Sequence, residues 1–169
     1  DRAIDLLQAR SSAPEPGAIR ELARAWMNRG NALQKQAHAD ALTAAVAAYD
    51  QAITQFARLP VSTDPTLCNS MGAAWLNRGH ALLQSGRIEH HTAAIASLEQ
   101  AVALLSRLPV ETGLSYRLNL AGAQTNLAQA LLDFPAQEQA HRFAAFAAAG
   151  TALRRSAQHE SQRAGFAEV

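Results

Sequence analysis

The sequence has few of the residues that disulfide-bonded, membrane-spanning or strongly charged proteins use. Cys68 is the only cysteine, so the chain can form no intramolecular disulfide and has no second thiolate for a metal site. No apolar run approaches the roughly 18 residues that a membrane span needs. The 15 basic and 14 acidic residues nearly balance. We therefore expect neither a nucleic-acid nor a membrane partner, and we expect Cys68 to be buried as a small apolar residue.

Signals for β-strands are also scarce, because valine and isoleucine are few and no alternating run is bounded by hairpin turns. Alanine, the best helix former, is the commonest residue, and apolar residues recur at intervals of three and four. The sequence thus predicts an all-α fold of about seven helices. They are expected at residues 2–10, 17–36, 39–59, 65–85, 89–107, 111–133 and 136–157.

Several of the expected helix ends have local signals. Two prolines and a glycine predict a break at 11–17. The sequence Ser-Thr-Asp-Pro at 62–65 supplies capping oxygens followed by a proline for the first helical position. Gly86 suits the left-handed conformation that often follows a helix. Pro60 and Pro109 each close the helix before them.

One block of sequence occurs twice. Residues 24–61 and 73–110, which lie 49 residues apart, are identical at 17 of 38 aligned positions. Such a fixed period indicates a repeat array, in which each unit buries its apolar face against its neighbours. The expected organisation is a partial repeat or N-terminal capping helix at 1–10, repeats at 17–60 and 61–109, a degenerate repeat at 110–157 and a tail at 158–169. Residues 3–7 look like the end of an earlier repeat, so we expect either an upstream segment or a cap.

The two clear repeats share one pattern of apolar and small residues, with a tryptophan at its start and a proline at its end. Its members are Trp26, Gly30, Leu33, Ala45, Tyr49, Ala52 and Pro60, then Trp75, Gly79, Leu82, Ala94, Leu98, Ala101 and Pro109. The pattern resembles the tetratricopeptide repeat (TPR), a helix–turn–helix unit of 34 residues, although the unit here has 49. The resemblance implies a TPR-like solenoid. We expect the glycines and alanines where paired helices nearly touch, and the tryptophans between pairs.

Asn28, Asn77 and Asn126 recur once in each repeat, although asparagine is a poor residue for a helix interior. Similar asparagine ladders occur in the O-GlcNAc transferase and kinesin light chain families. The resemblance implies that these amides hold the backbone of an extended peptide on a concave face. The alternative is that they bond to neighbouring loops or stack between helices. The expected peptide-binding set is completed by Asn31, His80, Gln129 and Arg24.

Other polar residues have plainer explanations. Arg29 and Arg78 could recognise a carboxylate or phosphate, but an ion pair with Asp50 or Glu99 in the facing helix is the simpler account. Four histidines near turns lack the carboxylate or thiolate support that metal ions prefer, so we expect them to be solvated. They are His38, His90, His91 and His141.

The sequence contains no Ser–His–Asp set, glycine-rich phosphate loop or zinc spacing. We therefore expect no enzyme activity, no cofactor and no metal. The primary hypothesis is a scaffold that binds another protein or a peptide. The alternatives are a homo-oligomerisation module, acting as a homodimer, and a regulatory or substrate-presenting segment of a larger enzyme. The sequence does not fix the compartment, and a cytoplasmic location is favoured.

Overall fold

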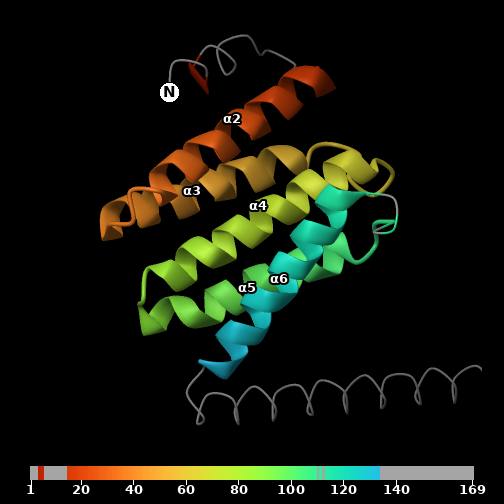
Figure 1. The fold of residues 1–169 in the computed structure, drawn as a ribbon. Coiled ribbons are helices and arrows are strands. Elements are labelled where there is room, and N and C mark those ends of the chain that lie inside the picture. The colour runs from red at the N-terminus through yellow and green to blue at the C-terminus, as the bar shows by residue number, and fades with distance from the viewer. Residues whose placement is uncertain (1–3, 6–14, 110, 112, 134–169) are drawn as a thin grey trace, which may run out of the picture. The chain divides into compact units, whose positions relative to one another are not determined.

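The described part of the chain is a set of five antiparallel helices that pack in sequential order (Figure 1). The computed structural model describes residues 4–5, 15–109, 111 and 113–133, and no strand occurs among them. The helices are α2 (Pro16–Gln34), α3 (Ala39–Phe56), α4 (Pro65–Gln84), α5 (Ile88–Leu105) and α6 (Leu114–Leu132). The prediction of an all-α chain is confirmed for these residues.

The five helices begin and end within three residues of their predicted bounds. The expected break at 11–17 is too long, because α2 begins at Pro16. Proline suits the first helical position, where its fixed φ is helical and its missing N–H leaves no bond unmade. The helices expected at 2–10 and 136–157 and the tail at 158–169 lie outside the described residues, apart from residues 4 and 5.

Local hydrogen bonds explain several helix ends. The Asp64 carboxylate accepts from the backbone N–H groups of Thr66 and Leu67 at 2.8 and 3.1 Å, and Pro65 opens α4, as the sequence predicts. Gly86 follows α4 with a φ of +65°, which confirms its predicted left-handed conformation. Ala37, one repeat earlier, has a φ of +57° after α2. The two α–α turns therefore share one backbone conformation.

The most extensive helix contacts lie within the pairs α2–α3 and α4–α5. At Gly30 a Cβ atom would lie 2.6 Å from Cε1 of Tyr49, and at Gly79 one would lie 2.7 Å from Cγ of Leu98. Both distances are shorter than atoms can approach, so a larger residue would force Tyr49 or Leu98, or the helix that carries it, to shift. The expectation that these glycines lie where paired helices nearly touch is confirmed. The four predicted small residues are fully buried, at Ala45, Ala52, Ala94 and Ala101.

Contacts between pairs join α3 to α4 and α5 to α6. Trp75 is half-buried and packs against two core clusters, one mainly of α2–α3 residues and one that includes residues of α5 and α6. Its position between pairs is the predicted one. Leu114 and Leu118 of α6 remain exposed. None of the described helices combines the length and apolarity required to cross a membrane.

Candidate functional site

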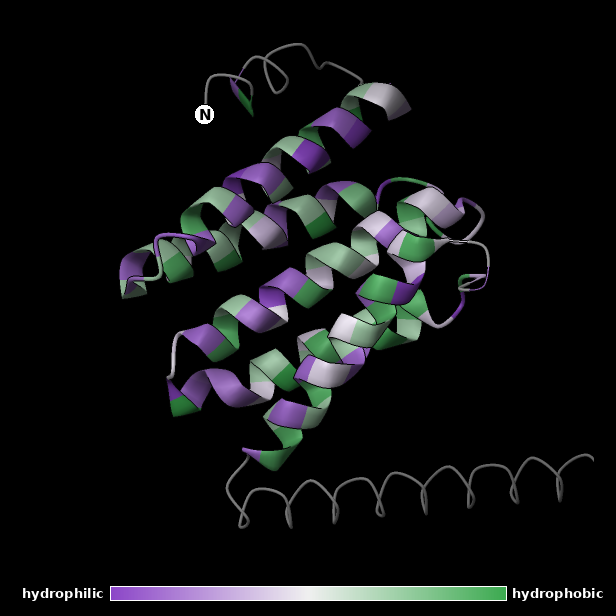
Figure 2. Cartoon of the chain, viewed as in Figure 1, coloured by the Kyte–Doolittle hydropathy of each residue, from purple (hydrophilic) through white to green (hydrophobic). Residues whose placement is uncertain are grey.

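An open hollow between the C-terminal halves of α2 and α4 is lined by polar side chains alone. The two helices run parallel, because each packs antiparallel to α3. Hydrophilic residues mark these halves of both helices in Figure 2. The hollow has a volume of about 410 Å³, and we call it the polar hollow. Its lining residues are Asn31, Gln34 and Lys35 of α2 and Asn77, His80 and Gln84 of α4.

Two amide groups connect the helices at the inner end of the polar hollow. Asn77 Nδ2 donates to Asn31 Oδ1 at 3.1 Å. The Tyr49 hydroxyl of α3 lies 2.8 Å from the same Asn31 oxygen and 2.7 Å from Gln34 Oε1. These bonds fix the direction of the Asn31 amide, because its oxygen faces two donors.

A second group of polar atoms forms the outer part of the polar hollow. Gln34 Nε2 lies 3.0 Å from His80 Nδ1 and donates to Gln84 Oε1 at 3.2 Å. The bond to His80 forms when Nδ1 is the unprotonated nitrogen of the ring, since the Gln34 NH₂ group can only donate. His80 and Gln84 are exposed, so an incoming ligand can reach these atoms.

Tyr49 of α3 connects the hydrogen-bond network of the polar hollow to the α2–α3 interface. Its side chain is fully buried in the α2–α3 interface, and burial raises the pKa of its phenol from 10.0 to about 12. The hydroxyl therefore stays protonated at all physiological pH values. Its single O–H proton therefore remains available to one of the two α2 amide oxygens beside it, those of Asn31 and Gln34.

Three of the predicted binding residues, Asn31, Asn77 and His80, lie together in the polar hollow. The others do not line it. Asn28 and Arg24 are exposed elsewhere on α2, where Arg24 lies 3.6 Å from Glu21 of the same helix. Asn126 and Gln129 belong to α6. Asn77 of the predicted ladder therefore pairs with Asn31, which lies one helical turn after the ladder residue Asn28.

Three residues of the polar hollow, Gln34, Lys35 and Gln84, were not among the predicted binding residues, although their helical spacing indicates them. Gln34 and Lys35 follow Asn31 by three and four positions, and Gln84 follows His80 by four, so each pair shares a helix face. The 49-residue period itself pairs Lys35 with Gln84 and Asn31 with His80, whereas Gln34 has Leu83 as its repeat equivalent. Residues that meet across the α2–α4 gap differ by 46 or 50 positions.

A second amide bridge, which was not predicted, joins two asparagines that lie 50 positions apart. Asn119 of α6 donates through Nδ2 to Asn69 Oδ1 of α4 at 3.0 Å. Both residues are half-buried. Each pair of successive parallel helices, α2–α4 and α4–α6, is therefore joined by one asparagine–asparagine hydrogen bond.

Arg78 forms the ion pair that the simpler account predicts. Its Nε atom lies 2.6 Å from Asp50 Oδ1 of α3, and its Nη1 atom donates to the buried Ser97 hydroxyl of α5. The guanidinium also lies over the Trp75 ring, 5.7 Å from its centroid. Arg78 thus connects three helices and is not presented to a ligand.

Two of the histidines near the turns, the exposed His38 and the half-buried His90, also form hydrogen bonds within the fold. His38 Nδ1 accepts from the backbone N–H of Ala41 at 3.3 Å and caps α3. His90 Nδ1 lies 2.8 Å from the Ser85 hydroxyl. An imidazole near a turn can accept an otherwise unpaired backbone N–H, as an asparagine would. His141 lies outside the described residues. Across the described ranges, no group of three or more potential metal ligands comes together.

The polar hollow offers hydrogen-bonding groups that match a peptide bond. Asn31 uses its oxygen twice, but its NH₂ group has no partner among the described residues. Asn77 uses one N–H, and its oxygen is likewise unpartnered there. A peptide group needs one donor for its C=O and one acceptor for its N–H. The asparagine pair can supply both.

No protein-family model matches the sequence, and comparisons with curated proteins and with solved structures gave no match.

Proposed function

We propose that this chain is a protein-binding scaffold whose polar hollow holds the backbone of an extended peptide segment of a partner protein. The observation that carries the proposal is the convergence of six polar side chains from two parallel helices on one open hollow. Amides dominate this lining and carry no net charge, so they favour a neutral polar ligand. The peptide backbone is the commonest group of that kind on a protein surface.

The helix arrangement supports a TPR-like array as the framework for this site. The first helix of each proposed unit, α4, contacts the next first helix, α6, as well as its own second helix, α5. Repeat arrays stack their units in this way, and the first helices then line one continuous face. The amide bridges Asn31–Asn77 and Asn69–Asn119 lie between such first helices.

The affinity of one hollow would be modest. Each hydrogen bond from a neutral amide contributes about 0.5–1.5 kcal/mol net. A segment that lies along both α2 and α4 would need apolar or charged side-chain contacts as well. Lys35 at the rim supplies the one cationic group of the hollow, which favours a segment with an acidic side chain near the bound peptide group.

Selection from a random peptide library tests the proposal without knowledge of the partner. Peptides enriched on the wild-type chain should bind the Asn31→Ala, Asn77→Ala double variant about tenfold more weakly, which corresponds to the loss of one or two hydrogen bonds. Isothermal titration calorimetry measures the affinities.

The matched control is the Asn28→Ala, Asn126→Ala double variant, which removes two asparagines that lie outside the polar hollow. Its affinity should equal that of the wild type. Equal loss in both double variants, or loss only in the control, would contradict the proposal. Thermal melts followed by circular dichroism verify that each variant is folded.

Self-association is the second candidate, and the exposed leucines Leu114 and Leu118 of α6 favour it. Light scattering over a range of protein concentrations separates the two candidates. A mass that rises with concentration supports self-association, whereas a constant monomer mass removes it.

A further inference from the structure

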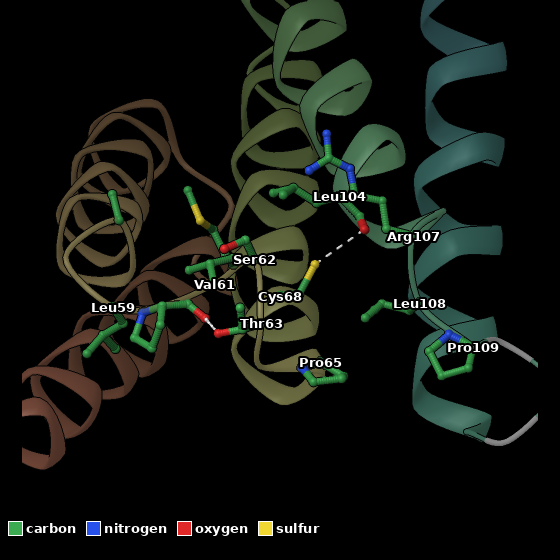
Figure 3. A pocket seen from close by; sticks show the side chains of 13 residues that line it. Leu59, Val61, Ser62, Thr63, Pro65, Cys68, Leu104, Arg107, Leu108 and Pro109 are labelled. Carbon is green, nitrogen blue, oxygen red and sulfur yellow. Dashed lines mark hydrogen bonds between the residues drawn. The ribbon is translucent and has the colours of Figure 1, made fainter.

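A second cavity lies at the other end of the helices, between the α3–α4 connection and the end of α5 (Figure 3). Its volume is about 490 Å³, within the range of small-molecule sites. Its walls include the two copies of the repeated Leu-Pro motif, Leu59-Pro60 and Leu108-Pro109, together with Val61 and Leu104. We call it the Leu-Pro pocket. It shares no residue with the polar hollow.

The walls of the Leu-Pro pocket are mainly aliphatic. Their hydrogen-bonding groups are largely occupied, because the Thr63 hydroxyl donates to Pro60 O at 3.2 Å and the Cys68 thiol donates to Leu104 O at 3.4 Å. Burial raises the pKa of the Cys68 thiol, which keeps it in the neutral form. An aliphatic group would therefore meet few unpaired polar atoms inside.

Arg107 is the one charged residue among those that line the Leu-Pro pocket, and no carboxylate lies beside it there. Its positive charge is close enough to Cys68 to lower the pKa of that thiol, against the larger effect of burial. Its repeat equivalent, Arg58, instead donates to Gln55 Oε1 at 2.7 Å and does not line the pocket. The pocket thus combines an aliphatic wall with one guanidinium that is not paired to a carboxylate in the described residues.

We propose that the Leu-Pro pocket binds an aliphatic chain that ends in a carboxylate, with the chain against the Leu-Pro segments and the carboxylate at Arg107. A planar guanidinium can form two parallel hydrogen bonds with a carboxylate, and such bonds are stronger than neutral ones. Two sources share this chemistry: a free fatty acid, and the C-terminal aliphatic residue of a polypeptide.

Titration of the ¹⁵N-labelled chain, followed by NMR, tests the proposal with three probes. They are octanoate, octanol and a short peptide that ends in leucine, the last with a free or an amidated C-terminus. Saturable shifts of the backbone signals of Val61, Cys68 and Leu108 should appear with octanoate or with the free-acid peptide. The probe that binds identifies the source.

The variant Arg107→Gln should weaken carboxylate binding about tenfold or more, because a charged hydrogen bond is lost. The matched variant Arg58→Gln should leave it unchanged. Both side chains are exposed, so both variants should fold. The proposal is overturned if neither acid gives saturable shifts, if octanol binds as well as octanoate, or if the two arginine variants behave alike.

Discussion

Ala37 and Gly86 occupy equivalent places in successive turns and share a left-handed backbone conformation. This conformation costs a residue with a Cβ atom about 1–2 kcal/mol, whereas glycine adopts it without that cost. The space around Gly86 is open, since no atom lies within 4 Å of where its Cβ would be. An alanine at position 86 would therefore meet backbone strain but no steric clash.

Ala37→Gly should raise the free energy of unfolding by about 0.5–1 kcal/mol, the relief of strain less the added entropy of the unfolded chain. The reciprocal change Gly86→Ala should lower it by about 1 kcal/mol. Urea unfolding of each variant measures both effects. A loss of stability in Ala37→Gly would show that its left-handed conformation carries no strain.

The raised pKa of Tyr49 gives a dependence of stability on alkaline pH. The unfolded phenol loses its proton near pH 10, whereas the buried one keeps it until about pH 12. The unfolded state therefore binds fewer protons in this window, and stability falls as pH rises from 10 to 12. Below pH 10 the contribution of Tyr49 is fully present.

Tyr49→Phe should remove this alkaline loss, because phenylalanine has no proton to release. Urea unfolding at pH 8 and pH 11 measures it, with Tyr116→Phe of the half-buried Tyr116 as the control. An equal fall in stability between the two pH values for the wild type and Tyr49→Phe would refute the assignment. Near pH 8, Tyr49→Phe should cost about 1 kcal/mol for the lost hydrogen bonds.

At the scale of helices, the ends were predictable and the lateral contacts between parallel helices were not. Asp64, Pro65 and Gly86 act within their own turns, so their roles follow from the local sequence. Gln34 and Gln84 meet only because α2 and α4 lie side by side at one particular offset. That offset depends on how the side chains of α3 pack against α2 and α4, and the 49-residue repeat period does not determine it.

Arg78 couples neighbouring helix pairs, because it bonds to Asp50 of α3 and to Ser97 of α5. A double-mutant cycle with Arg78→Met and Asp50→Asn should give a coupling energy of about 0.5–1 kcal/mol, since the Asp50 side chain is 47% exposed and the pair is partly screened. Urea unfolding supplies the four stabilities.

The control cycle pairs Arg78→Met with Asp40→Asn, an exposed carboxylate in the first turn of the same helix, α3. Its coupling energy should be near zero. A coupling as large as that with Asp50 would mean that the effect of Arg78 is long-range and not due to the ion pair.

In the described part of the molecule, the helix pairs follow the sequence prediction, and three residues of the predicted peptide-binding set, Asn31, Asn77 and His80, line the polar hollow. Asn77 belongs to the predicted ladder of Asn28, Asn77 and Asn126, which stood out because asparagine is a poor residue for a helix interior. The hydrogen-bond partner of Asn77 in α2 is Asn31 and not Asn28, the asparagine one repeat earlier. Side chains that meet between two parallel helices lie on the facing edges of those helices. The Leu-Pro pocket could not be predicted from the sequence, because its two walls come from segments about 50 residues apart in the chain.

If the polar hollow holds a peptide backbone, as we propose, the side-chain NH₂ groups that line it should report the binding. NMR titration with a peptide selected on the wild-type chain should shift the NH₂ signals of Asn31, Gln34, Asn77 and Gln84 together and saturably. The NH₂ signals of Asn28 and Asn126 should stay in place. Shifts confined to Asn28 and Asn126, to α6 or to the Leu-Pro pocket would contradict the claim.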